Sequence, residues 1–199
     1  MKDRLRNAID TLLDIMRSNK LHVVNCEKEI LRGLQFEGDP NIKGYVDMIL
    51  GDDIDYLYVF DFKWTSSKNH YPELLKKNGS LQLALYKEMV EKELGRDVAA
   101  VAYYLMPENC LYSTTSFEGE HTEKLEEEEN VGKDLFLQVK NSYKYRLQQI
   151  KDGKIELGEG KLEKYLQYVN DTKKEGLMPL RVRDGVKETN IFSNYKCFK

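Results

Sequence analysis

The spacing of apolar residues near the start of the chain indicates a helix followed by a strand. Between Lys2 and Ser18 apolar residues recur at helical spacing and charged residues fall between them, which predicts an amphipathic helix. The apolar stripe of this helix is expected to consist of Leu5, Ile9, Leu12 and Met16. From Leu21 onward the period falls to two, which is typical of a strand.

Three further strands and a second helix are predicted up to residue 105. Residues 43–50 and 55–63 have strand character, and the Gly51-Asp52-Asp53 segment between them suits a tight hairpin. A short helical piece is expected over 72–77. A longer helix is expected from near Ser80 to Gly95, because Gly is the usual left-handed residue after a helix. Residues 98–105 are apolar on both faces, which predicts a buried central strand.

The second half of the chain has weaker patterns. Residues 118–130 are strongly acidic, which favours a solvated loop or lid. Two more helices are expected, one around Leu135 to Ile150 and one around Leu162 to Val169. The order of elements predicts an α/β fold with a mixed central β-sheet flanked by helices. We expect one domain over 1–199, with a core at about 20–106 and a helical part at about 130–175.

Composition and charge narrow the class of protein. With 41% hydrophobic and 33% charged residues, the 199-residue chain is long enough to bury a core. A formal net charge of −3 argues against a protein that coats nucleic acid with its whole surface, because such a surface is usually basic. It argues less against an enzyme whose metal ligands are themselves carboxylates. The three scattered cysteines form no disulfide or zinc pattern. No signal peptide or membrane span is recognisable, so a cytoplasmic protein without a membrane partner is expected.

Charged residues interrupt two neighbouring apolar strands. Asp47 lies within the apolar run 44–50, and Asp61 and Lys63 lie at the end of the run 56–64. Residues two apart in a strand share a face, so Asp61 and Lys63 are expected to project together. Phe60, Phe62 and Trp64 are expected to point the other way, into a hydrophobic layer. If the two strands form a hairpin, Asp47 lies beside Asp61.

Two adjacent carboxylates predict a divalent cation site. The carboxylates repel each other, burial worsens the repulsion, and a cation removes it. Mg²⁺ suits one or two carboxylates plus a substrate phosphate, and a bound metal lowers the pKa of water to give a nucleophile. Lys63 would hold that water or offset transition-state charge. Either Glu27 or Glu29, of which motif spacing favours Glu27, and the Phe62 carbonyl could add ligands.

Four short motifs follow one another on the predicted strands and helix. They are Cys26-Glu27-Lys28-Glu29, Gly44-Tyr45-Val46-Asp47, Asp61-Phe62-Lys63 and Gln82-Leu83-Ala84-Leu85-Tyr86. In this order they resemble the pattern of the PD-(D/E)XK nuclease superfamily, within it the RecB-like branch of helicase–nucleases that process DNA ends. The family pattern is a glutamate-bearing strand, then G-x-x-D, D-x-K and a helix with Q-x-x-x-Y. The resemblance covers about the first half of the chain and depends on the four motifs occurring together.

The resemblance implies a restriction-endonuclease-like core and a nuclease that hydrolyses DNA with Mg²⁺ or Mn²⁺. Asp47 and Asp61 would be metal ligands and Lys63 the catalytic lysine. Gln82 and Tyr86 would face the site, contacting substrate or steadying the lysine. We expect an exonuclease that acts on DNA ends in repair or recombination, with DNA and a helicase subunit or domain as partners.

Two departures from the family pattern leave alternatives open. Many RecB-like nucleases carry a metal-binding histidine upstream of the first strand, but none of the three histidines lies in the first predicted helix. Relatives with an iron–sulfur cluster carry several cysteines near the C-terminus, where this chain has only Cys197. One alternative is a catalytically inactive DNA-binding or assembly domain of the same fold. Another is a restriction-type endonuclease, which the Q-x-x-x-Y helix makes less favoured.

Overall fold

A computed structural model of the chain describes residues 2–30, 42–65, 67–127 and 135–153. Internal contacts divide the chain into two compact units between Leu135 and Phe136, and each unit is described by itself. The predicted helix around Leu162 to Val169, and most of the predicted helical part at about 130–175, lie outside the described residues. None of the described helices combines the length and apolar character that a membrane span requires.

The first unit contains a mixed sheet of six strands that follow the chain in the order β1-β2-β3-β4-β5-β6. β1 and β2 are antiparallel, as are β2 and β3, whereas β3 and β4 are parallel. β4 and β5 are antiparallel, and β5 and β6 are parallel. The strand bounds are β1 His22–Ile30, β2 Gly44–Gly51, β3 Leu57–Lys63, β4 Val98–Leu105, β5 Cys110–Ser113 and β6 Thr122–Lys124. The predicted α/β fold with a mixed sheet flanked by helices is confirmed at this level.

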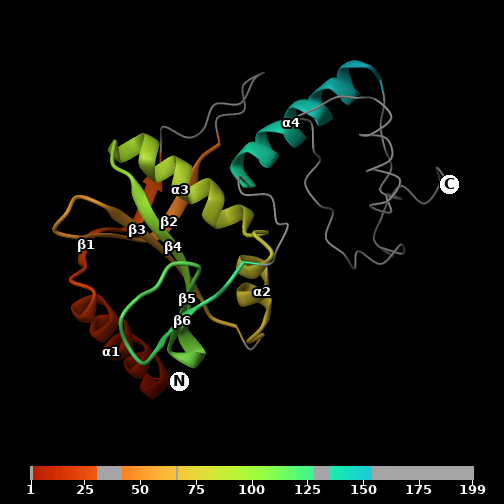
Figure 1. Cartoon of the computed structure of the whole chain (residues 1–199). Helices are drawn as coiled ribbons and strands as arrows, with labels where there is room; N and C mark the ends of the chain where they lie inside the picture. Colours follow the sequence, from red (N-terminus) through yellow and green to blue (C-terminus); the bar gives the residue numbers. More distant parts are fainter. Residues whose placement is uncertain (1, 31–41, 66, 128–134, 154–199) are drawn as a thin grey trace. The chain divides into compact units, whose positions relative to one another are not determined.

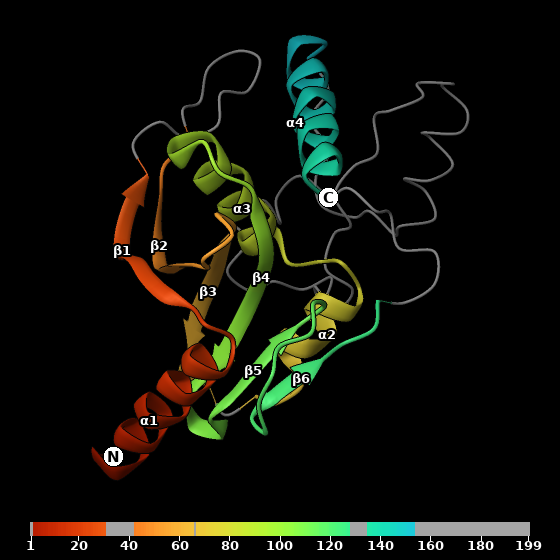
Figure 2. The same cartoon turned by 60° about the vertical axis from the view of Figure 1, so that its left-hand side comes forward.

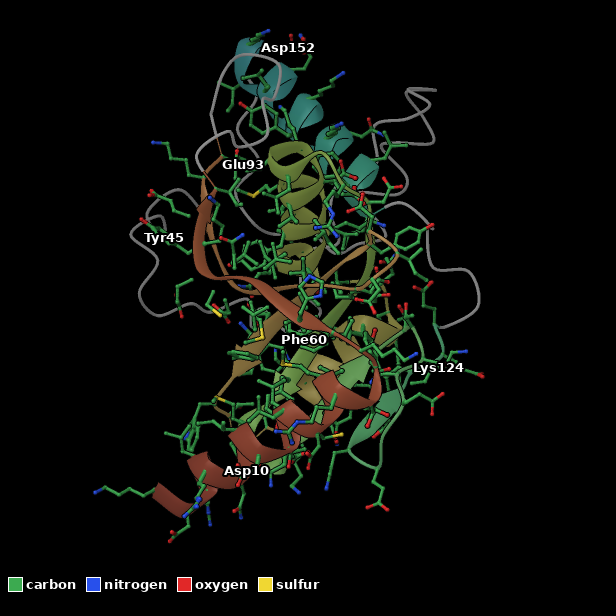
Figure 3. The ribbon with its side chains drawn as sticks, turned by 90° about the vertical axis from the view of Figure 1, so that its left-hand side faces the viewer. Asp10, Tyr45, Phe60, Glu93, Lys124 and Asp152 are labelled. Atoms are coloured by element: carbon green, nitrogen blue, oxygen red, sulfur yellow. The ribbon has the colours of Figure 1, made fainter. Side chains whose placement is uncertain are left out.

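Helices of the first unit pack on both faces of the sheet (Figure 1). They are α1 Lys2–Ser18, α2 His70–Lys76, α3 Leu81–Leu94 and the short 3-10 helix η1 Met106–Glu108. Figure 2 shows α1 and α3 on different sides of the sheet, and Figure 3 shows Phe60 between α1, which carries Asp10, and α3, which carries Glu93. The helix α4 Leu135–Lys151, which belongs to the second unit from Phe136 onward, is close to the helix predicted around Leu135 to Ile150.

Alternate residues of the central strands divide the core into two layers. One layer joins α1 to the sheet and comprises Ala8, Leu12, Ile15, Met16, Leu21, Met48, Leu50, Phe60, Ala102, Tyr104 and Leu111. The other layer joins α2 and α3 to the opposite face and comprises Leu75, Leu83, Tyr103, Leu105, Tyr112 and Leu125. Because Tyr103 and Tyr104 are neighbours in β4 and fall in different layers, both faces of this strand are buried, as predicted from its continuous apolar run.

The buried face of α1 differs from the predicted stripe. Leu12 and Met16 are buried as expected, but Leu5 is 42% exposed and Ile9 is 46% exposed. Ala8 and Ile15 take their places in the core. The Tyr104 hydroxyl donates a 2.6 Å hydrogen bond to the Ala8 carbonyl, and the small alanine side chain lets the helix approach β4 closely. The spacing predicted the helix, but tertiary packing selected which face of it is buried.

The prediction that Trp64 points into the hydrophobic layer is wrong. Phe60 is fully buried against α1, and Phe62 packs against the same layer, in agreement with strand alternation. Trp64 is 52% exposed. The reason is that β3 ends at Lys63, so the two-residue alternation no longer fixes the direction of the next side chain.

The region beyond β4 contains two strands that the sequence did not predict. β5 has only four residues, too few for alternation to be recognised, and β6 has three polar residues. The acidic segment 118–130 was expected to be solvated, but its described part includes β6 and the buried Leu125. Glu126 and Glu127 are exposed, as a solvated segment requires. Pairing with β5 therefore orders part of a segment that its charge alone assigns to a loop.

The hairpin between β2 and β3 is stabilised by the side chain of Asp52. Its Oδ1 accepts hydrogen bonds from the backbone N–H groups of Ile54 and Tyr56 at 3.0 and 2.9 Å. Its Oδ2 accepts a 2.9 Å hydrogen bond from the Tyr58 hydroxyl. Burial acts to raise the pKa of Asp52, but these hydrogen bonds outweigh it and hold the pKa below its ordinary value. The turn that brings β2 beside β3 thus depends on an ionised carboxylate.

Replacing Asp52 with alanine is expected to lower the free energy of unfolding at pH 7 by about 1–2 kcal/mol, because three hydrogen-bond donors lose their acceptor. The folded-state pKa lies below the unfolded value, so this contribution is present above an ordinary pKa of about 3.9 and is lost as the pH falls through the lower folded value. Urea unfolding of both proteins from pH 7 to pH 3 measures the difference, which should shrink in acid. A difference independent of pH would contradict the role of the ionised carboxylate.

Candidate metal site at the ends of β2 and β3

The register of β2 and β3 brings two carboxylates to the same place on the sheet. Met48 pairs with Phe60 in this antiparallel hairpin, and continuing the register by one residue places Asp47 opposite Asp61. Facing residues of antiparallel strands share a face of the sheet. Met48 and Phe60 belong to the α1 layer, so Asp47 and Asp61 lie on the opposite face, which α3 covers. The two carboxylates are therefore on one side of the sheet, at adjoining strand positions.

Asp47 is held by the backbone of the neighbouring strand. Its Oδ2 accepts a 2.8 Å hydrogen bond from the N–H of Phe62. The backbone pairing of β2 and β3 stops at Met48 and Phe60. Beyond it, the Asp47 carboxylate accepts the hydrogen bond that a backbone carbonyl of β2 would accept if the pairing continued. The N–H and the carbonyl of one strand residue point to the same side of the strand, so the Phe62 carbonyl is directed toward β2 as well. The Phe62 side chain lies on the other face, in edge contact with Tyr104 at 6.0 Å between ring centroids.

Asp61 is a buried carboxylate with fewer polar partners, among the described residues, than its two oxygens can accept. It is 1% exposed, and its Oδ2 lies 2.5 Å from Nζ of Lys63. Among the residues that the structure describes, its Oδ1 has no hydrogen-bond partner. Burial raises the pKa of Asp61; Lys63 lowers it, the negative charge of Asp47 raises it further, and the net direction is upward. A buried carboxylate in this state is poorly compensated, and an additional cation would stabilise its ionised form.

Lys63 connects the carboxylates to α3. Besides Asp61, its Nζ donates a 3.0 Å hydrogen bond to Oε1 of Gln82. Nε2 of Gln82 in turn donates a 2.9 Å hydrogen bond to the hydroxyl of Tyr86, one helical turn further along α3. The Q-x-x-x-Y residues therefore meet the lysine of the D-x-K motif through a continuous chain of hydrogen bonds.

The start of α3 is fixed against β4, which sets the position of Gln82. Ser80 is the N-cap residue, and its Oγ accepts a 3.4 Å hydrogen bond from the Leu83 N–H. The same Oγ shares a 2.6 Å hydrogen bond with the hydroxyl of Tyr103. Burial raises the pKa of Tyr103 to about 12, Ser80 acts against this, and the Asp61 charge adds to it, so Tyr103 stays neutral at physiological pH. The helix ends where Gly95 adopts the left-handed conformation at φ 66°, as predicted.

The glutamates of β1 are not gathered into the group formed by Asp47, Asp61 and Lys63. The register of β1 and β2 places Glu27 opposite Asp47, but Glu27 is exposed and has a positive φ of 47°, which distorts the strand there. Glu29 pairs with Tyr45 and, as a hydrogen-bond partner, raises the pKa of the Tyr45 hydroxyl. Within the described parts of the chain, no three His, Cys, Asp or Glu residues converge in a way that could hold a metal ion. The structure thus does not place a third carboxylate beside Asp47 and Asp61.

The structure also places residues beside Lys63 that the sequence did not indicate. The rings of Tyr71 on α2 and Tyr103 on β4 lie 5.5 and 5.7 Å from Nζ, measured to their centroids. The only available signal was weak: Tyr103 is a hydroxyl-bearing residue within a strand predicted to be fully buried, so its hydroxyl needed a partner. Nothing in the pattern around Tyr71 pointed to the site.

The chain matches no protein-family model and no curated protein. The geometry of these residues and the order of the motifs in the sequence are therefore the features from which a function can be inferred.

Proposed function

We propose that the chain is a Mg²⁺- or Mn²⁺-dependent DNA nuclease with a restriction-endonuclease-like core of the PD-(D/E)XK kind. The observation that carries this proposal is that Asp47 and Asp61 face each other one residue beyond the last β2–β3 pair, with Lys63 in contact with Asp61. A buried carboxylate oxygen without a hydrogen-bond partner among the described residues destabilises the folded state. Proteins typically retain such unfavourable groups where they serve a function.

The residues present fit a hard divalent cation. The two carboxylates and the Phe62 carbonyl are all oxygen donors, which Mg²⁺ and Mn²⁺ prefer. Oδ1 of Asp61 has no hydrogen-bond partner in the described part of the chain, and the pKa of this buried carboxyl is raised, so an added cation would stabilise its ionised form. Mg²⁺ commonly uses one or two carboxylates and completes its shell with water and substrate oxygens, so a third acidic ligand is not required. The metal, when bound, would polarise the phosphodiester and favour ionisation of a water molecule.

The other residues would act on substrate charge and on positioning. The Lys63 ammonium is the one cationic group in contact with Asp61 among the described residues, and it would stabilise negative charge that develops on the phosphate during cleavage. Gln82 accepts a hydrogen bond from Lys63 and so fixes where the ammonium lies. Tyr86 orients the Gln82 amide, because its hydroxyl accepts from Nε2 and leaves Oε1 facing the lysine.

DNA as the substrate, action on DNA ends and attachment to a helicase are proposals supported by the four motifs in family order. The Q-x-x-x-Y segment is the feature that favours the end-processing branch over a site-specific endonuclease. Its two side chains contact each other, and Gln82 contacts the lysine of the third motif.

The purified chain is expected to degrade end-labelled linear DNA with Mg²⁺ or Mn²⁺, and EDTA is expected to stop this. Asp47→Asn should reduce the rate at least a hundredfold, because the amide keeps an acceptor for the Phe62 N–H but lacks the charge that holds a cation. Asp14→Asn, which changes an exposed aspartate on α1, is the matched control and should cleave at the wild-type rate.

Other outcomes would contradict the proposal in different ways. Cleavage that persists in EDTA, or that survives Asp47→Asn, would show that this site is not responsible. DNA binding without metal-dependent cleavage would favour an inactive binding or assembly domain. Nicking of closed circular DNA at defined positions would favour a restriction-type endonuclease.

A further inference from the structure

Two tyrosine rings lie beside the ammonium group of Lys63. Its Nζ lies 5.5 Å from the ring centroid of Tyr71 and 5.7 Å from that of Tyr103, within the range of cation–π attraction. The two rings contact each other, with centroids 4.7 Å apart. The lysine side chain is only 18% exposed, so these attractions act with limited screening by water.

Both rings are held in place by contacts other than those with Lys63. Tyr103 is 2% exposed in the central strand β4, where it pairs with Asp61 in register and is tied through its hydroxyl to Ser80. Tyr71 lies on α2, with its ring also in edge contact with His70 at 4.9 Å between centroids. A lysine has four rotatable bonds, and holding its ammonium in one place requires contacts from several directions.

The partners of Lys63 differ in how a cation at the carboxylates would affect them. A cation bound by Asp61 competes for the same carboxylate charge and weakens the Lys63–Asp61 ion pair. The tyrosine rings and the Gln82 amide are neutral, so their attraction for the ammonium does not depend on the charge state of Asp61.

We propose that Tyr71 and Tyr103 are positioning residues that hold the Lys63 ammonium beside the carboxylates when a metal ion occupies Asp61. The importance of this position for catalysis rests on the proposed nuclease function, whereas the contact energy between ring and ammonium does not.

Tyr71 is the better residue for the kinetic test, because it is only partly buried. Tyr71→Leu removes the aromatic face, and we expect kcat for DNA cleavage to fall about tenfold while KM for DNA changes less than twofold. Tyr71→Phe keeps the ring and should retain kcat within about twofold. Unchanged kcat in Tyr71→Leu, or equal losses in the leucine and phenylalanine variants, would overturn the proposal.

A second measurement needs no nuclease activity. In EDTA, urea unfolding of wild type, Tyr71→Leu, Lys63→Met and the double variant forms a double-mutant cycle. We expect Tyr71→Leu to shift the unfolding midpoint less in the Lys63→Met background, because the ammonium that the ring attracts is already gone. Tyr56→Leu, an exposed tyrosine outside this cluster, is the control and should give additive shifts. Additive shifts for Tyr71 as well would overturn the proposal.

The two measurements separate the two proposals. Coupling between Tyr71 and Lys63 in a protein that cleaves no DNA would contradict the nuclease function and leave the lysine contact standing. Cleavage by wild type with no coupling and no loss of kcat in Tyr71→Leu would contradict the positioning role and leave the nuclease function standing.

Discussion

Replacing Lys63 with methionine is expected to reduce the rate of metal-dependent DNA cleavage by a factor of about a hundred to a thousand. Methionine has a similar length and can pack beside the rings of Tyr71 and Tyr103, but it carries no charge. The lost group is the cation that would stabilise charge developing on the phosphate. Because neither Asp47 nor Asp61 is altered, a divalent cation should still bind.

The measurement is single-turnover cleavage of linear DNA at saturating protein, which separates the chemical step from binding. DNA binding can be followed by the fluorescence of Trp64, the only tryptophan, which is 52% exposed and follows Lys63 directly. Lys87→Met removes an exposed lysine from α3 and is the matched control. If Lys63→Met cleaves DNA at the wild-type rate, the lysine takes no part in the reaction. If Lys63→Met and Lys87→Met lose the same fraction of the rate, the loss reflects general electrostatic binding of DNA.

The hairpin that builds the site could be predicted because its signals are local. Alternation of apolar residues defined β2 and β3 to within two residues at each end, and the Gly-Asp-Asp segment marked the turn. Once the strands pair, the register follows from the turn, and parity places Asp47 and Asp61 on one face. Charged residues within apolar strands are rare because burying a charge is unfavourable, so those that occur are easy to recognise in a sequence.

The surroundings of the lysine could not be predicted, because they depend on packing between distant segments. Tyr71 reaches Lys63 only because α2 folds against the face of the sheet that carries Tyr103. Tyr103 is brought there by the parallel pairing of β3 with β4, which are separated by two helices in the chain. No periodic pattern in a single segment contains that information.

The structure does not bring the expected third carboxylate beside the two aspartates, for a different reason. Strand parity does not separate Glu27 from Glu29, motif spacing favours Glu27, and the register of the flanking pairs places Glu27 opposite Asp47. A single residue with positive φ, Glu27 itself, disturbs the strand and leaves the side chain exposed. Backbone irregularities of this kind have no reliable signature when the residue is neither Gly nor Asn.

Replacing Asp61 with asparagine is expected to have opposite effects on stability with and without a divalent cation. In EDTA the ionised carboxylate is buried, and its Oδ1 has no hydrogen-bond partner among the described residues. Asparagine has the same shape without the charge, while Lys63 keeps Gln82 and the tyrosine rings as partners. Removing one poorly compensated buried charge should raise the free energy of unfolding by about 1 kcal/mol, which corresponds to about 2–4 °C in Tm for a chain of this size.

With Mn²⁺ at about a hundred times its Kd, the wild-type protein should gain about 2.7 kcal/mol, or about 5–10 °C in Tm, because the ion binds the folded state. Asp61→Asn should gain little, since an amide is a weak ligand for a hard cation. The order of the two melting temperatures is therefore expected to reverse when metal is added. Asp14→Asn, with its exposed carboxylate on α1, should follow the wild type in both conditions. Equal stabilisation of wild type and Asp61→Asn by Mn²⁺ would show that the ion binds elsewhere, because the charge that distinguishes them would then play no part in holding it.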